Sequence, residues 1–260
     1  MSSKHNPTKT NYFDRAYAYL LSFDEISEET IDTHLHYWKT SKPKNLKQLF
    51  KTLLNHVKNR QSMPNTIGDI EKLKEILFNF DPHKVRKSYG SWEEIFDIVE
   101  STRLTETRLN RTESKSHWVI YCKAILSVAD FLRPYRTIDD YQRFVDGFLT
   151  NEYSRLALPL LLKEEIFGFG FALACDFLKE TGNSEFLKPD THINDIARGL
   201  GITTSTTNYG VFKDVEAYCK AIGRPPYEVD KLFWLVGSGK FYLSGITIHS
   251  SKHEFIRLNT

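Results

Sequence analysis

The sequence predicts an all-α protein, and two observations carry this prediction. Apolar residues recur at helical spacing in segments 11–22, 45–58, 69–80, 91–100 and 116–132. Strand-like alternation is rare, and its best example is the short tail around 241–249, where we expect at most one small hairpin. In 45–58 the apolar residues that share one helical face are Leu46, Leu49, Phe50, Leu53, Leu54 and Val57.

Polar stretches separate these helices. Asp69 and Ser91 stand where N-caps are expected, one residue before an apolar periodic segment. Segments 59–65, 101–115 and 203–208 read as loops because they are rich in Pro, Asn, Ser and Thr.

Composition limits the classes of protein. The 260 residues are 40% hydrophobic and 26% charged, which is typical of a globular chain. We expect a cytoplasmic protein with no membrane partner, because no long apolar window and no apolar leader occur. The net charge of +2 permits a nucleic-acid partner without requiring one. The three cysteines, Cys122, Cys175 and Cys219, are too far apart to form a metal-type cluster, so we expect reduced buried thiols.

Residues 156–182 are the most informative part of the chain. An apolar helix over 156–166 runs into Phe167, Gly168, Phe169 and Gly170, and a second helix follows that ends near Gly182. Two helices joined by such a turn form a helix-hairpin-helix motif. Glycines let backbone N–H groups approach a phosphate, and the second helix presents its positive N-terminal dipole. The alternative is that the glycines serve only tight packing.

The second helix is followed by Pro189-Asp190-Thr191-His192. A glycine-rich hairpin, a helix and then an aspartate that opens the next helix resemble the helix-hairpin-helix (HhH-GPD) DNA glycosylase superfamily, in its endonuclease III-like branch. The resemblance covers roughly residues 45–240 and is clearest over 156–201. It implies two helical subdomains with the helix-hairpin-helix at their cleft, double-stranded DNA as partner, and a monomer.

The same reading divides the chain. We expect an N-terminal helical extension over 1–45, a central helical subdomain over 46–165 and the helix-hairpin-helix over 156–182. C-terminal helices over 183–260 are expected to pack with the N-terminal helices.

Two departures from the family pattern matter. Bifunctional members carry a nucleophilic lysine two residues after the second hairpin glycine, where this chain has Ala172. The resemblance therefore implies a monofunctional enzyme that uses water, with Lys188 as a substitute nucleophile to be tested. No cysteine follows Cys219, so the family's iron–sulfur cluster is not expected. We expect no cofactor, apart from a monovalent cation that this motif class can hold at the hairpin.

The resemblance makes Asp190 the candidate catalytic residue. A carboxylate beside C1′ of a nucleotide stabilises an oxocarbenium-like sugar and orients the attacking water. The alternative is that Asp190 only caps the helix that begins at Thr191. These two roles are compatible.

Other candidates for DNA contact lie elsewhere in the sequence. Arg60 and Gln61 follow an apolar helix, and a loop at this place in similar proteins can insert a side chain into the gap left by a flipped base. The alternative is a plain solvated loop. Trp118 and Tyr121 are either base-stacking or core residues, and helical spacing with Ile125 favours the core. His117 and His192 have no metal-ligand partners in sequence. Basic residues that face either phosphate or solvent are Arg103, Arg108, Arg111 and Lys115.

Three functions remain open from the sequence. The first is a DNA N-glycosylase of base excision repair that releases a damaged or modified base. The second is a catalytically inactive helix-hairpin-helix protein that only binds DNA. The third is a helical interaction protein unrelated to DNA.

Overall fold

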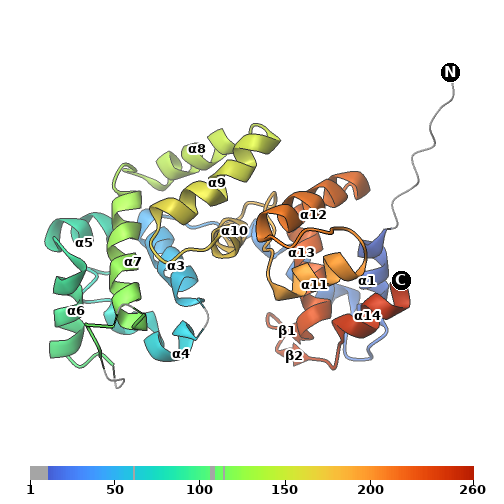
Figure 1. Cartoon of the computed structure of the whole chain (residues 1–260), viewed down its shortest axis with the longest axis horizontal. Helices are drawn as coiled ribbons and strands as arrows, with labels where there is room; N and C mark the ends of the chain where they lie inside the picture. Colours follow the sequence, from blue (N-terminus) through green and yellow to red (C-terminus); the bar gives the residue numbers. More distant parts are fainter. Residues whose placement is uncertain (1–10, 61, 106–108, 114) are drawn as a thin grey trace. The chain divides into compact units, whose positions relative to one another are not determined.

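The computed structural model describes residues 11–60, 62–105, 109–113 and 115–260. Within these ranges the protein consists of α-helices, two short 3₁₀ helices and one two-stranded sheet (Figure 1), which confirms the predicted fold class. The chain divides into two compact units. The central unit is Lys42–Phe177, and the terminal unit combines Met1–Ser41 with Leu178–Thr260. Every helix of the described ranges is too short or too polar to cross a lipid bilayer.

The central unit is arranged around α7 (His117–Leu132), which has buried residues on all its faces, including Trp118, Tyr121, Ile125 and Leu132. A helix that is apolar all round belongs inside a core. Helices α3, α4, α5, α6 and α9 pack against it. The elements around α7 are α3 (Leu46–Lys58), α4 (Met63–Ile67), η2 (Ile70–Leu73), α5 (Pro82–Ser88), α6 (Trp92–Ser101), α8 (Ile138–Phe148) and α9 (Glu152–Glu165).

The helix predicted over 69–80 is wrong. Only Ile70–Leu73 is helical, as a 3₁₀ turn capped by Asp69, and Phe78, Asn79 and Phe80 have φ of 49°, 59° and 59°. Consecutive left-handed residues cannot continue an α-helix. Four apolar side chains of this segment are nevertheless buried, those of Ile70, Leu73, Leu77 and Phe80. The apolar spacing in this segment therefore reflects which side chains are buried, and it does not indicate a helix. Residues 59–65, predicted as a loop, include the start of the short α4.

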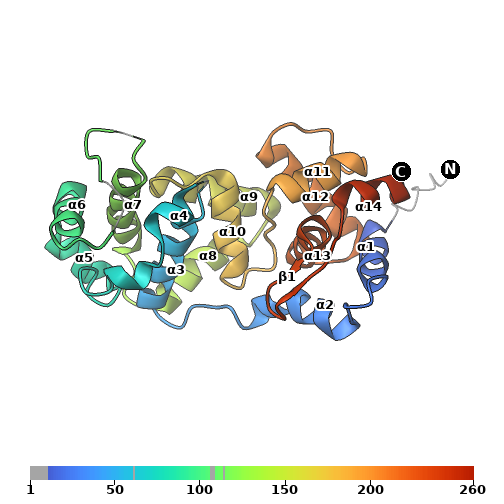
Figure 2. The ribbon, with the colours of Figure 1, turned by 90° about the horizontal axis from the view of Figure 1, so that it is seen from below.

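The terminal unit surrounds α13 (Pro226–Ser238), against which α1, α2, α11, α12 and α14 pack. Figure 2 shows these helices together with the small sheet. The sheet pairs Lys240 with Thr247 and Phe241 with Ile246, antiparallel, in the tail where a hairpin was expected. The elements are α1 (Tyr12–Leu21), α2 (Glu28–Leu35), η1 (Tyr37–Lys39), α11 (Thr191–Gly199), α12 (Asn208–Ile222), β1 (Lys240–Phe241), β2 (Ile246–Thr247) and α14 (Lys252–Asn259).

His34 ties α2 to the C-terminal tail of this unit. Its ring is fully buried, Nδ1 lies 2.8 Å from the Thr30 carbonyl oxygen, and Nε2 accepts a hydrogen bond from the Leu243 N–H at 3.1 Å. This arrangement requires a neutral imidazole that carries its proton on Nδ1. Burial lowers the pKa of His34, the Thr30 contact opposes this effect, and the charge of Lys231 lowers the pKa further.

Acid is therefore expected to destabilise the terminal unit through His34. Because the pKa is lower in the folded chain, the stabilisation is complete above the unfolded value of about 6.5 and declines as the pH falls below it. Between pH 7.5 and 5.5 the loss attributable to His34 is expected to be at most about 1.4 kcal/mol, which corresponds to a folded imidazole that takes up no proton. Chemical denaturation of wild type and His34→Gln at both pH values measures this change in the free energy of unfolding. An equal pH dependence in the two proteins would contradict the assignment.

Candidate functional site

The hairpin between α9 and α10 (Phe171–Glu180) is built on the core of the central unit. Gly168 has φ of 86°, a conformation that favours glycine. A Cβ at this position would lie 3.5 Å from Ile120 and 3.8 Å from Val57. The Phe167 N–H donates to the Ser127 hydroxyl of α7 at 2.8 Å, which anchors the turn. Gly168 is therefore explained by the turn and its packing.

The residues of the hairpin alternate between core and surface. Phe169 is 6% exposed and its ring lies 6.3 Å from that of Phe177, so its side chain belongs to the core. Phe167 is 45% exposed, and the ammonium of Lys123 lies 5.5 Å from its ring centroid. A Cβ at Gly170 would meet no atom within 4 Å. An exposed ring, a lysine and an open glycine thus lie at the start of α10.

Gly170 also begins α10, since its carbonyl oxygen accepts from the Ala174 N–H at 3.0 Å. The first N–H groups of an α-helix have no partner within that helix and carry its positive dipole. Ala172 lies in this first turn, at the position of the family lysine, and its methyl group supplies no nucleophile. At the other end Gly182 has φ of 88° and the Asn183 N–H returns to the Leu178 carbonyl oxygen at 3.3 Å. The predicted glycine stop is confirmed.

Asp190 is the N-cap of α11 in the terminal unit. One carboxylate oxygen, Oδ1, accepts from the N–H groups of His192 at 2.9 Å and Ile193 at 3.1 Å. The second oxygen, Oδ2, makes no hydrogen bond with any residue of the described ranges. The side chain is partly exposed. Asp190 therefore caps its helix with one oxygen and leaves the other available for chemistry.

An aromatic group lies near the start of α11. The His192 and Trp234 rings meet edge to face with centroids 6.4 Å apart, and Trp234 in turn contacts Tyr242 at 5.8 Å. A Cβ at Gly237 would lie 2.5 Å from His192 Nδ1, so the absence of a side chain there makes room for the imidazole. Nδ1 is buried and has no hydrogen-bond partner in the described part of the chain.

Sequence reasoning missed a buried polar cluster beneath Asp190. Asp230 of α13 accepts from Lys179 Nζ at 2.7 Å and from the backbone N–H of Lys188. Lys231 Nζ lies 2.9 Å from Glu180 Oε1 and 2.8 Å from the Tyr242 hydroxyl. The available signal was the pair of charged residues inside the apolar run of α13, because buried charges require partners.

The other residues predicted to contact DNA lie in different parts of the central unit. Arg60 is exposed in the turn between α3 and α4, where Ser62 has φ of 66°. Gln61, the second candidate in this loop, lies outside the described residues, as does Arg108. Trp118 and Tyr121 are 1% and 0% exposed, so base stacking by these two rings is wrong and the core alternative is confirmed.

The other basic candidates lie around the 101–115 segment. Arg111 is paired with Asp97 and covers the ring of Phe96 at 5.2 Å, while Arg103 and Lys115 are exposed. His117 bonds to Thr66 at 2.8 Å. No group of three or more possible metal ligands occurs in the described ranges, and the three cysteines are buried thiols.

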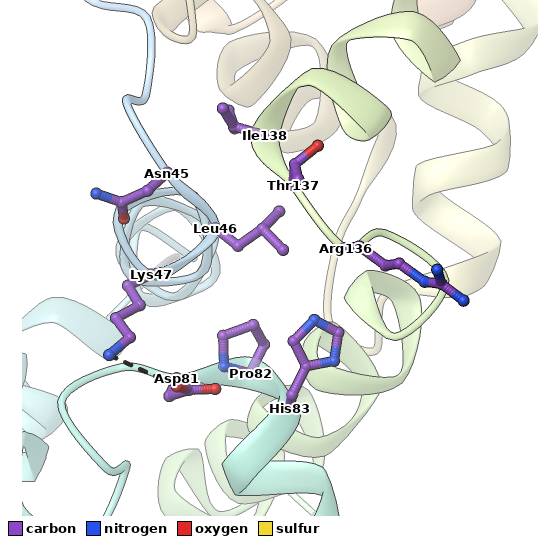
Figure 3. A pocket seen from close by; sticks show the side chains of 9 residues that line it. All are labelled: Asn45, Leu46, Lys47, Asp81, Pro82, His83, Arg136, Thr137 and Ile138. Atoms are coloured by element: carbon purple, nitrogen blue, oxygen red, sulfur yellow. Dashed lines mark ion pairs between the residues drawn. The ribbon is translucent and has the colours of Figure 1, made fainter.

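A hollow of about 530 Å³ lies in the central unit where α3, α5 and α8 begin (Figure 3). Its capping residues Asn45, Asp81 and Thr137 each accept a backbone N–H of their own helix, at 2.9, 3.1 and 3.2 Å. Lys47 pairs with Asp81 at 3.5 Å. These groups are engaged in the fold, and we assign the hollow no chemistry. It is lined by Asn45, Leu46, Lys47, Asp81, Pro82, His83, Arg136, Thr137 and Ile138.

Comparison with known proteins identifies the fold. Neither the protein-family models nor the curated proteins give a match to this sequence. Among solved structures, the 8-oxoguanine DNA glycosylase of Thermotoga maritima aligns at 15% identity with a TM-score of 0.51, covering 88% of this chain and 97% of the other. The 8-oxoguanine glycosylase/lyase of Methanocaldococcus jannaschii, solved with DNA containing 8-oxoguanine, aligns at 19% identity with a TM-score of 0.54, covering 87% and 97%. The chain therefore has the all-α fold of these two solved glycosylases.

Proposed function

We propose that this protein is a DNA N-glycosylase of base excision repair. The observation that carries the proposal is the shared fold, which extends over nearly the full length of two solved DNA glycosylases. The local geometry supports it, since the aspartate that opens α11 keeps one carboxylate oxygen unengaged within the described residues. Both neighbours act on 8-oxoguanine, so we propose this base, or a purine lesion of similar shape, as the first substrate to test.

The proposed chemistry assigns one role to each part of the chain. The hairpin and the start of α10 hold a phosphate of double-stranded DNA, and this contact reads no sequence. The target base leaves the stack, which costs a few kcal/mol and costs least for a damaged base. Asp190 stabilises the positive charge that develops on the sugar and orients a water for attack at C1′, which leaves an abasic site and the free base.

We propose that the enzyme is monofunctional. Lyase chemistry needs an amine that attacks C1′ and forms a Schiff base. Ala172 supplies none at the family position, whereas the Methanocaldococcus jannaschii protein is a glycosylase/lyase. Water is then the nucleophile, and the phosphodiester backbone stays intact.

The first test incubates the protein and its Asp190→Asn variant with duplexes that carry 8-oxoguanine, uracil, hypoxanthine, 3-methyladenine or thymine glycol. We expect wild type to release one of these bases and to leave strands that break only after alkali. Asp190→Asn should lose at least about 10³-fold in rate, because the carboxylate charge is gone. Its melting temperature should change little, since Asn caps helices about as well as Asp. Asp195→Asn on the same helix is the matched control.

Other outcomes of this test lead elsewhere. Strand breaks before alkali would show lyase activity and make Lys188→Ala the next variant. Salt-sensitive DNA binding with no release from any duplex would favour the inactive DNA-binding protein. The absence of any DNA binding would rule out both readings and leave an interaction protein.

The hairpin is tested by Gly170→Ala. Since an added Cβ meets no atom of the chain, we expect the free energy of unfolding to stay within about 0.5 kcal/mol of wild type or to rise. If backbone N–H groups here approach a phosphate, the methyl group stands in the way and DNA affinity should fall about tenfold, or about 1.4 kcal/mol. Fluorescence anisotropy at fixed salt measures it.

Gly147→Ala is the matched control for the hairpin. Gly147 lies in α8, is exposed, and also has open space around its Cβ position. It should gain stability and keep its DNA affinity. Wild-type affinity in both variants would mean that Gly170 does not lie against a phosphate.

A further inference from the structure

The turn that carries Asp190 is held at all its backbone polar groups. The Asp190 N–H donates to the Lys188 carbonyl oxygen at 2.8 Å, and Pro189 has no N–H to satisfy. Asn194 covers the other carbonyls, with its side-chain amide 3.3 Å from Pro189 O and its N–H 2.8 Å from Asp190 O. The remaining group, the Lys188 N–H, donates to Asp230 Oδ2. This last contact comes from a distant element, α13.

Asp230 is held just as firmly on its other side. Its Oδ1 accepts from Lys179 Nζ at 2.7 Å, and the two side chains are 1% and 5% exposed. Since both carboxylate oxygens accept, the geometry is that of the ionised form. Burial raises the pKa of Asp230, Lys179 lowers it, and the charge of Asp190 raises it again. Asp230 and Lys179 therefore form a buried pair, and its carboxylate accepts a backbone N–H of the turn before Asp190.

Stability alone would not require an ion pair between Asp230 and Lys179. A buried ion pair can often be replaced by apolar residues of similar volume without loss of stability. Here the carboxylate also binds a backbone N–H, and a leucine at position 230 could not replace this contact. The direction of the Lys188–Asp190 turn, and with it the orientation of the unengaged Asp190 oxygen, depends on that hydrogen bond.

We propose that Asp230 and Lys179 are positioning residues for Asp190. This inference rests on the proposed function, in which Asp190 Oδ2 faces the reacting sugar. A misplacement of about 1 Å in a catalytic group costs about 10²-fold in rate. Neither Asp230 nor Lys179 needs to touch the substrate for its loss to slow base release.

The test uses the full chain with a double variant, Lys179→Met with Asp230→Leu, and the single variant Asp230→Asn. The double variant removes both charges of the pair, and Glu180, which also lies 3.6 Å from Lys179, keeps its contact with Lys231, so the variant is expected to fold. Its single-turnover rate of base release should fall about 30-fold, while its dissociation constant for the same duplex stays within about threefold. Backbone hydrogen exchange followed by NMR should show loss of protection at the Lys188 amide. Asp230→Asn should fall between wild type and the double variant in both readouts.

The matched control is another ion pair of the terminal unit, Lys252 with Asp195, whose atoms lie 2.6 Å apart. Lys252→Met with Asp195→Leu should leave the rate of base release and the protection of Lys188 unchanged. A purely structural role for Asp230 would lower the melting temperature and leave the rate below that temperature unaltered, and this result would overturn the proposal. The proposal would also be overturned if folded Asp230 variants kept the wild-type exchange protection of the Lys188 amide.

The exchange measurement also separates this inference from the proposed function. If wild type releases no base from any duplex, the glycosylase proposal fails. Greater exchange at Lys188 in the Asp230 variants would then still establish that the pair holds the turn. Equal exchange would overturn the positioning itself.

Discussion

Asp230 lies on the central helix of the terminal unit, where its carboxylate is only 1% exposed. A carboxylate withdrawn from water is costly unless every lone pair finds a donor. Lys179 at the end of α10 and the Lys188 N–H before α11 supply these donors. The electrostatic requirement of one side chain thereby joins α13 to the end of α10 and to the turn before α11, across 51 and 42 residues of chain. In the proposed positioning role, these contacts orient the turn that carries Asp190 at the start of α11.

The other residues of the polar cluster connect α13 to α2 and to the C-terminal tail. Lys231, next to Asp230, bonds to Glu180 and to the Tyr242 hydroxyl. The Tyr242 ring contacts His34 of α2 edge to face at 5.1 Å, and His34 accepts from the adjacent Leu243 N–H. Residues 28–35 thus complete the terminal unit together with the C-terminal tail. The N-terminal segment, which the family resemblance left unexplained, supplies part of the scaffold around α13.

The central unit is held together by apolar packing. Its hairpin has some residues that pack in the core and others that are exposed. Gly168 and Phe169 face α7, α3 and Phe177, whereas Phe167 and Gly170 remain at the surface. The positive φ and close neighbours of Gly168 explain that glycine without any ligand. Gly170 has no positive φ and no close neighbour, so neither constraint accounts for it. A phosphate that approaches the start of α10 would account for it, which is why the two glycines are distinguished in the proposed function.

The sequence by itself determined the helical class, the positions of several helices, the hairpin with its stop at Gly182, and Asp190 as a residue that caps the start of a helix. These features follow from short-range rules of periodicity, capping and glycine conformation. Only the tertiary structure showed that segment 69–80 buries apolar side chains without forming an α-helix. It also decided that Trp118 and Tyr121 are core residues. It alone brought Lys179 and Lys188 to Asp230, because a pairing across 42 or more residues of chain leaves no local pattern.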